Sequence, residues 1–199
     1  MSDTYKRIIE EFTSFTDCNT NNTHIILSDW IPKFNIPRDG YWLEFGVHSG
    51  ATINKLSQCC DKIYGFDSFD GLPEDWIGDH KKGHFAMDAP PAVSDNVELL
   101  IGWFDETLPK FVEEHEIDKI SFINMDCDLY SSTKTVFKYL GPYIKPGTYI
   151  YFDEFLLKKD MKRNEGVAFA EFLDEYGLDY DILCTVSTQL PIQTLVKIK

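Results

Sequence analysis

The segment YWLEFGVHSG, residues 41–50, decides the fold class of this chain. Its first five residues form a largely apolar run, which favours a β-strand, and Gly46 follows directly. Gly46 and Gly50 permit a tight turn and let a ligand approach the backbone closely. The segment therefore predicts a strand over Tyr41–Phe45 that passes through a glycine turn into a helix over Ala51–Cys60.

The same strand-then-helix alternation continues along the chain. We expect further strands at Lys62–Asp67, Val97–Ile101, Ile120–Met125 and Thr148–Phe152, helices at Phe104–His115, Ser131–Leu140 and Lys162–Tyr176, and a closing pair of strands at Tyr180–Val186 and Gln193–Ile198. Pro109 fits the first turn of a helix that starts near Leu108. The long stretch 68–95 carries Gly, Pro and Asp with little periodicity, which indicates a functional or mobile loop.

The pattern predicts an α/β fold, a Rossmann-like, seven-stranded, mostly parallel sheet with helices on both faces. We expect a single domain over 1–199, with an N-terminal helical segment in 1–39 and the Rossmann-like core in 40–199. Within that segment, residues 3–16 read as a helix that Asp3 could cap, residues 19–23 as a turn and residues 23–31 as a second short helix.

Composition narrows the class of protein. The 199 residues carry 33 acidic and 19 basic side chains, a net charge of −14, which disfavours nucleic acid and anionic membrane as partners. The basic run at Lys158-Lys159 and Lys162-Arg163 is short and reads as a solvated loop. Five cysteines without a C-x-x-C pair indicate free thiols in a reducing compartment, so we expect a cytoplasmic protein. No apolar run approaches the ~18 residues that a membrane span requires.

Ligands of such sheets bind beyond the carboxyl ends of the strands, so these positions are the candidates for a site. Asp67 ends the second strand, 23 residues after Glu44, where an acid can accept hydrogen bonds from a ribose diol. Gly102-Trp103 follows the third strand, where an aromatic ring could flank an adenine. Each feature also has a purely structural explanation: the glycines could only form a turn, Asp67 could cap a helix or a turn, and Trp103 could pack in the core. The absence of G-x-G-x-x-G argues against an NAD-dependent oxidoreductase.

Carboxylates follow the fourth and fifth strands. Asp126 and Asp128 come after the fourth, and Asp153 and Glu154 after the fifth. Neighbouring strands lie about 5 Å apart, so these groups would converge, and a hard divalent cation would offset their repulsion. We predict Mg²⁺ held by Asp126, Asp153 and Glu154. The alternative is that some of these acids cap helices or contact the cofactor, and Asp128 could cap the helix that follows.

Four stretches together resemble class I S-adenosylmethionine-dependent methyltransferases, and more specifically the macrocin and mycinamicin type sugar O-methyltransferases. They are LEFGVHSG at 43–50, YGFDSFDGLP at 64–73, GWFDETLP at 102–109 and DCDLYSST at 126–133. The resemblance implies a class I methyltransferase fold and magnesium at the acidic positions. It also implies that Glu44 and the Gly46–Gly50 turn face the methionine part of the cofactor and that Asp67 binds the ribose. Where catechol-type enzymes carry Asp-Asn, this chain carries Asp-Glu.

The sequence thus predicts metal-assisted methyl transfer from S-adenosylmethionine to a hydroxyl of a sugar or related small molecule. The expected cofactor contacts are Glu44, Gly46, His48, Ser49, Gly50, Asp67, Ser68, Gly102, Trp103 and Asp126. Asp126 and His84 are the candidate bases; His115 reads as a surface residue. The chain is shorter than the macrolide enzymes, so a macrolide acceptor does not follow. A metal-independent methyltransferase, a non-catalytic cofactor-binding protein and a homo-oligomer all stay open.

Overall fold

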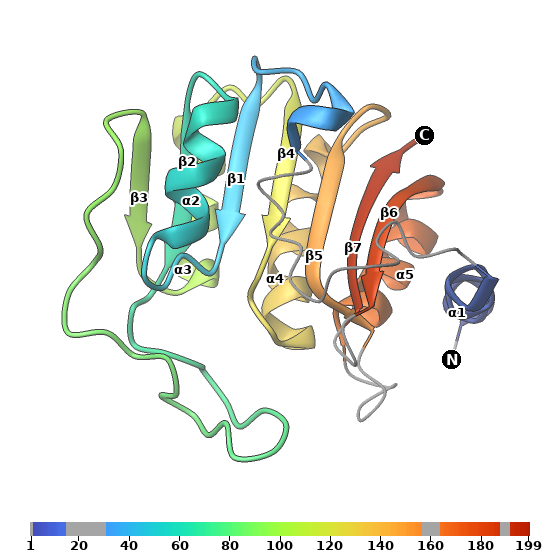
Figure 1. Ribbon diagram of the computed structural model, residues 1–199, viewed down its shortest axis with the longest axis horizontal. Coiled ribbons are helices and arrows are strands. Elements are labelled where there is room, and N and C mark those ends of the chain that lie inside the picture. The colour runs from blue at the N-terminus through green and yellow to red at the C-terminus, as the bar shows by residue number, and fades with distance from the viewer. Residues whose placement is uncertain (1, 15–30, 157–163, 188–191) are drawn as a thin grey trace.

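Seven strands form one mixed sheet in the order β3-β2-β1-β4-β5-β7-β6 (Figure 1). The computed structural model describes residues 2–14, 31–156, 164–187 and 192–199. The first five strands run parallel, whereas β7 runs antiparallel to both β5 and β6. The strand bounds are β1 Tyr41–Phe45, β2 Ile63–Asp67, β3 Val97–Ile101, β4 Ile120–Met125, β5 Tyr149–Leu156, β6 Tyr180–Ser187 and β7 Ile192–Ile198.

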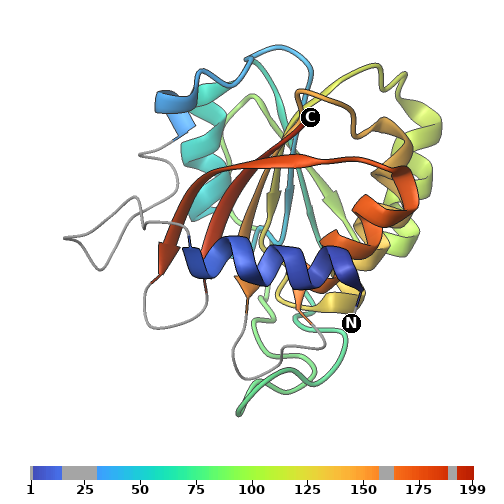
Figure 2. The ribbon, with the colours of Figure 1, turned by 90° about the vertical axis from the view of Figure 1, so that its right-hand side faces the viewer.

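Helices cover both faces of this sheet. They are α1 Asp3–Ser14, α2 Ala51–Leu56, α3 Phe104–Glu114, α4 Tyr130–Leu140 and α5 Glu165–Tyr176, with short 3₁₀ turns η2 Ile31–Phe34, η3 Ser57–Cys59 and η4 Gly141–Tyr143. Figures 1 and 2 show α3, α4 and α5 against one face and α2 with η2 against the other, while α1 crosses beside α5. Each face has its own buried apolar cluster. The predicted α/β class and the sheet covered on both faces are therefore confirmed.

Several predicted elements agree residue for residue. The bounds of β1, β3 and β4 are those that the sequence predicts, and residues 68–96 form the long connection without helix or strand. Gly177 ends α5 in the left-handed conformation, as its place after Tyr176 suggests. The predicted turn at 19–23 and most of the predicted helix at 23–31 lie outside the described residues.

Four local predictions were wrong for identifiable reasons. The helix α3 begins at Phe104, as the predicted range Phe104–His115 states, and the alternative start near Leu108 was wrong. Acidic residues in the first turn suit a helix N-terminus at Phe104, so Pro109 lies inside the helix. At α1, the hydroxyl of Ser2, not Asp3, accepts a backbone hydrogen bond, from Tyr5 N at 3.1 Å. The regular turns of α2 stop at Leu56 and continue as 3₁₀.

The fourth difference concerns β5, which runs to Leu156 rather than ending at Phe152. Its pairing with β4 does stop at Phe152, opposite Met125. Beyond that point β5 continues because β7 pairs with it, as far as Leu156 opposite Ile192. Asp153 and Glu154 therefore lie on an extended strand that projects past its parallel neighbour.

The order in which successive strands are added to the sheet reverses at β1. After β3 at the edge, the next strand, β4, lies on the other side of β1. The carboxyl ends of β1 and β4 therefore leave a crevice between diverging connections, the usual ligand site of such sheets. Figure 1 shows the 68–96 connection extending below this end of the sheet.

Candidate active site

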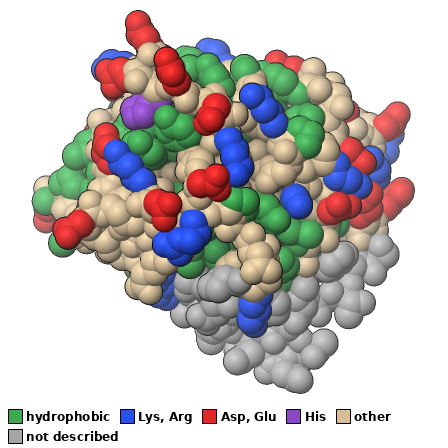
Figure 3. Space-filling model, turned by 90° about the horizontal axis from the view of Figure 1, so that it is seen from above, with side chains coloured by type: hydrophobic (Ala, Val, Ile, Leu, Met, Phe, Trp, Pro, Cys, Tyr) green, Lys and Arg blue, Asp and Glu red, His purple; other side chains and the backbone are tan. Residues whose placement is uncertain are grey.

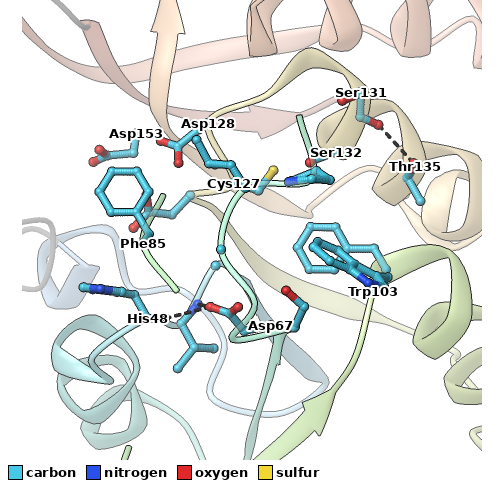
Figure 4. Close-up of a pocket in the computed structure, with 18 of the residues that line it drawn as sticks. His48, Asp67, Phe85, Trp103, Cys127, Asp128, Ser131, Ser132, Thr135 and Asp153 are labelled. Carbon is cyan, nitrogen blue, oxygen red and sulfur yellow. Dashed lines mark hydrogen bonds between the residues drawn. The ribbon is translucent and has the colours of Figure 1, made fainter. Parts of the chain in front are cut away.

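A cleft of about 670 Å³ lies at the carboxyl ends of the five parallel strands. Its walls come from the exits of these strands, from α4 and from the 68–96 connection (Figure 4). The residues that line it include Gly46, His48, Ser49, Asp67, Ser68, Phe85, Gly102, Trp103, Asp126, Asp128, Ser131, Ser132, Thr135, Asp153 and Glu154. The sequence placed its candidates at these strand exits, and most of them do meet here.

Gly46 sits where the β1 turn presses against the exit of β4. Its φ is +91°, and a Cβ built on it would lie 1.8 Å from the backbone oxygen of Asp126. The neighbouring strands fix this turn: Gly46 N donates to Phe66 O at 3.0 Å, and Asp126 N donates to Phe45 O at 3.0 Å. Only glycine fits here, so the turn and Asp126 form one rigid unit.

The carboxylate of Asp67 organises the same turn from the side of β2. Its Oδ2 accepts hydrogen bonds from the backbone N–H groups of Val47 and His48, both at 2.8 Å, and its Oδ1 accepts one from Phe69 N at 2.8 Å. His48 adopts a left-handed φ of +45° in this arrangement. Asp67 is half-buried and lines the cleft, so it both holds the turn and faces a ligand.

The opposite end of the cleft is aromatic and hydroxylic. Trp103 lies at the exit of β3, facing the first turns of α4, which present Ser131, Ser132 and Thr135 (Figure 4). Figure 4 shows Trp103 on the far side of the cleft from Phe85, Asp128 and Asp153. The cleft is thus divided into an aromatic end, a central Asp67 and an acidic end.

Three carboxyl groups converge at the acidic end. Asp126, Asp128 and Glu154 each bring an oxygen within 4.8 Å of the others. Burial raises the pKa of all three, and repulsion from neighbouring carboxylates adds to the effect; the pKa of Glu154 rises to about 12. Oε2 of Glu154 has no hydrogen-bond partner among the described residues. A buried, repelling set of oxygen ligands with an unsatisfied atom fits a hard divalent cation.

Asp153, which the sequence assigned to the metal, lines the cleft beside this trio. Its Oδ1 accepts hydrogen bonds from the Tyr151 hydroxyl at 3.2 Å and from the side-chain amide of Gln193. The converging set includes Asp128, whereas Asp153 lies beside it, and the assignment of Asp153 to a metal stays a prediction. Asp128 does not cap α4, because the residue before that helix is Leu129 and no side chain caps it.

Other predicted site residues lie away from the cleft wall. Glu44 is fully buried under the turn, where burial, and next the charge of Asp126, raises its pKa well above the usual range. Gly50 begins α2 with φ +76° but is not part of the lining. His84 is exposed and stacks near His80 and Phe85. His115 is half-buried against Tyr64 and Phe111 rather than on the surface.

Sequence reasoning missed two residues at this site. Glu165, at the start of α5, is fully buried, and its Oε2 accepts the backbone N–H of Glu154 at 3.2 Å. Burial raises the pKa of Glu165 well above its usual range. Phe85 lines the cleft from the 68–96 connection. An acidic residue in the first turn of a helix is explained by capping or by interaction with the helix dipole, so Glu165 gave no sign of a site. A Phe in a loop without periodicity gives no functional signal either, so neither residue could be found from the sequence.

Comparisons with known proteins agree with this geometry. Demethyldecarbamoylnovobiocin O-methyltransferase from Streptomyces niveus is 29% identical over 174 residues, which are 74% of this chain and 61% of that protein. An 8-demethyl-8-(2,3-dimethoxy-α-L-rhamnosyl)-tetracenomycin-C 4′-O-methyltransferase from Streptomyces olivaceus is 24% identical over 66% of this chain and 56% of that protein. The chain therefore spans about three-fifths of the length of these curated relatives.

The solved structure of the calicheamicin methyltransferase CalS11 shares the fold. It superposes with a TM-score of 0.66 at 21% identity, over 98% of this chain and 91% of that one. The model of the macrocin O-methyltransferase (TylF) family matches residues 35–184, which include the exits of all five parallel strands that build the cleft. The chain belongs to the macrocin O-methyltransferase (TylF) family.

Proposed function

We propose that this protein transfers a methyl group from S-adenosylmethionine to a hydroxyl of a sugar or sugar-bearing small molecule. The observation that carries the proposal is the continuity of the cleft: the glycine turn held by Asp67 opens directly onto the carboxyl trio of Asp126, Asp128 and Glu154. Family membership and the names of both relatives support an O-methyl transfer. The rhamnosyl group named in the second relative supports a deoxysugar acceptor.

The cofactor would lie along the cleft from the aromatic end to the glycine turn. Trp103 would stack on its adenine, Asp67 would meet the ribose hydroxyls, and the turn through Gly46 and His48 would face the methionine part. Ser49, Ser68 and Gly102 also line this stretch of the cleft. An acidic cleft also attracts the positive charge of a sulfonium.

The trio is proposed to hold a divalent cation, with Mg²⁺ as the expected ion. When bound, such a cation polarises an acceptor hydroxyl and lowers its pKa. Asp126, Asp128 and Glu154 would supply the oxygen ligands, and Glu165 holds the backbone of Glu154 in place. Asp153 is half-buried beside them and would orient the acceptor or a ligand water.

Methyl transfer joins the acceptor oxygen to the methyl carbon, breaks the carbon–sulfur bond and leaves its electron pair on sulfur. The protein must therefore align the acceptor and remove its proton. Asp126 is placed for the second task, because its backbone is fixed against Gly46 and its carboxyl group lines the cleft. His84 stays an alternative base only if its exposed ring turns toward the cleft on acceptor binding.

Calorimetry with S-adenosylhomocysteine and labelled methyl transfer to nucleotide-linked and antibiotic-linked deoxysugars test the proposal. We expect the wild type to bind S-adenosylhomocysteine, and Asp67→Ala to bind it at least tenfold more weakly. Asp126→Asn should lower kcat by about 10²–10⁴, whereas Glu113→Gln, an exposed change on α3, should leave it unchanged. Binding of NAD in place of S-adenosylhomocysteine would contradict the proposal. Full activity in chelator would contradict only the proposed role of the metal ion.

Within the described residues, no helix is both long enough and apolar enough to cross a membrane. A cytoplasmic location and a homo-oligomer stay predictions from the sequence. The cytoplasmic prediction is tested by fractionating the cells that express the protein, and the oligomeric state by light scattering of the purified chain.

A further inference from the structure

The 68–96 connection places an apolar ring in solvent at the acidic end of the cleft. Phe85 is 41% exposed, and it is one of three large hydrophobic side chains that are exposed among the described residues. It is also part of the cleft wall, and Figure 4 draws it on the same side of the cleft as Asp128 and Asp153. A ring with this exposure buries little apolar area on folding, and its place in a cleft wall that also carries carboxyl groups suits a role in ligand binding.

The connection is built to hold Phe85 there. Leu72 N donates to His84 O and Gly83 N donates to Leu72 O, both at 2.9 Å, which closes a narrow loop around Gly71. Phe85 has a φ of +68°, a conformation that residues with side chains rarely adopt. The hydrogen-bonded loop maintains this unfavourable backbone, which turns the ring toward the cleft instead of packing it in the core.

Other rings of the same connection back Phe85 and form a continuous wall. The ring of His80 stacks on Phe85 with centroids 5.6 Å apart and on Trp76 with centroids 5.3 Å apart. His84 meets Phe85 edge-on at 4.3 Å, and His48 approaches it at 5.9 Å from the β1 turn. We define these five side chains, Trp76, His80, His84, Phe85 and His48, as the aromatic wall.

The wall stands close to the carboxyl trio. Phe85 of the wall lines the same cleft as Asp126, Asp128 and Glu154, so a ligand in this cleft can meet the ring and the carboxyl groups together. A ligand between wall and trio meets a flat apolar surface on one side and oxygen acceptors on the other. Such a pairing of an aromatic surface with a few convergent polar groups is the usual make-up of a small-molecule site.

We propose that Phe85 is the stacking platform for the sugar ring of the acceptor. One face of such a ring presents C–H groups, which would lie on Phe85, while its edge presents hydroxyls, which would point to Asp126, Asp128 and Glu154. The aromatic end of the cleft, at Trp103, would bind the nucleoside of the cofactor. This inference rests on the proposed function and names the subsite of its acceptor.

The test uses the full chain with Mg²⁺ and S-adenosylhomocysteine, and methyl α-L-rhamnopyranoside as the sugar probe. Saturation-transfer NMR measures the probe's contact with the protein, and calorimetry measures S-adenosylhomocysteine binding in parallel. Phe85→Leu keeps the apolar character and the backbone strain but removes the flat ring, whereas Phe85→Tyr keeps the ring. Tyr176→Leu, which removes an exposed ring from the end of α5, is the matched control.

We expect Phe85→Leu to bind the probe about tenfold more weakly while S-adenosylhomocysteine binding stays unchanged. Phe85→Tyr and Tyr176→Leu should bind both ligands as the wild type does. The proposed role of Phe85 is wrong if Phe85→Leu binds the probe as tightly as the wild type does. It is also wrong if Phe85→Tyr loses as much probe affinity as Phe85→Leu. No probe signal from wild type that binds S-adenosylhomocysteine overturns the sugar subsite alone, whereas failure to bind S-adenosylhomocysteine counts against the proposed function itself.

Discussion

Gly46 carries the sharpest steric requirement in the site. A methyl group at this position would overlap the backbone oxygen of Asp126, and neither backbone can move without breaking strand hydrogen bonds. The contact links the turn that would face the cofactor to the residue that would remove the acceptor's proton. A single glycine therefore sets the spacing between the two halves of the proposed reaction.

We predict that Gly46→Ala lowers the free energy of unfolding by about 3 kcal/mol or more, because overlap adds to the cost of a positive φ. Gly147→Ala is the matched control, since Gly147 has φ +100° with nothing within 4 Å of the added carbon. It should cost only about 1–2 kcal/mol. Urea unfolding of both variants checks the difference, and equal losses would show that strain rather than overlap dominates.

At the scale of elements, the sequence predicts best where local pattern and tertiary pairing agree. The bounds of β4, a strand buried on both faces, follow from its apolar run. The end of β5 could not be read in the same way, because it depends on pairing with β7, some forty residues later in the chain. Asp126 and Glu154 were predicted as strand-exit acids, but the convergence of Asp128 with them could not be predicted, because Asp128 adopts a left-handed φ of +63° that no spacing reveals.

A side-chain hydrogen bond joins the 68–96 connection to α4. The hydroxyl of Ser131, which lines the cleft, donates to Glu74 Oε1 at 2.6 Å. A bond to a charged acceptor contributes about 1.5–3 kcal/mol, enough to keep the connection closed most of the time. The same bond would slow the exchange of any ligand beneath it.

We predict that Ser131→Ala speeds amide hydrogen exchange at Leu72, Gly83 and Met87, whose N–H groups bond within this connection, by about tenfold. The control is Ser132→Ala, because Ser132 shares the helix turn but, within the described ranges, makes no hydrogen bond to the connection. Hydrogen-exchange mass spectrometry of both variants is the measurement. Unchanged protection in Ser131→Ala would mean that the loop's internal bonds alone hold it closed.

The whole molecule carries a net charge of −14 and concentrates several of its acids in one buried place. Asp126, Asp128, Asp153, Glu154 and Glu165 all have a pKa raised chiefly by burial. A raised pKa means that the folded state binds protons that the unfolded state has already released. Stability therefore falls as pH rises above the unfolded value of about 4.

We predict that the metal-free protein loses stability steadily from pH 5 to pH 8, by up to about 1.4 kcal/mol per pH unit for each carboxyl group that stays protonated when folded. Mg²⁺ should raise Tm more at pH 8 than at pH 6, because it binds the ionised trio. Thermal unfolding in chelator and in Mg²⁺ tests both statements. Asp128→Asn, which keeps a residue tolerant of positive φ, should flatten the pH slope; an unchanged slope would place the cause outside the trio.

The position of β7 between β5 and β6 has a consequence for biosynthesis. β5 and β6 do not pair with each other, so both present unpaired strand edges until residues 192–198 have left the ribosome. Gln193, whose side-chain amide donates a hydrogen bond to Asp153, lies in the same segment. A nascent chain that stops before this strand would thus expose two strand edges with unpaired backbone groups, which chaperones bind. Synthesis of β7 would then complete the sheet and the cleft in a single step.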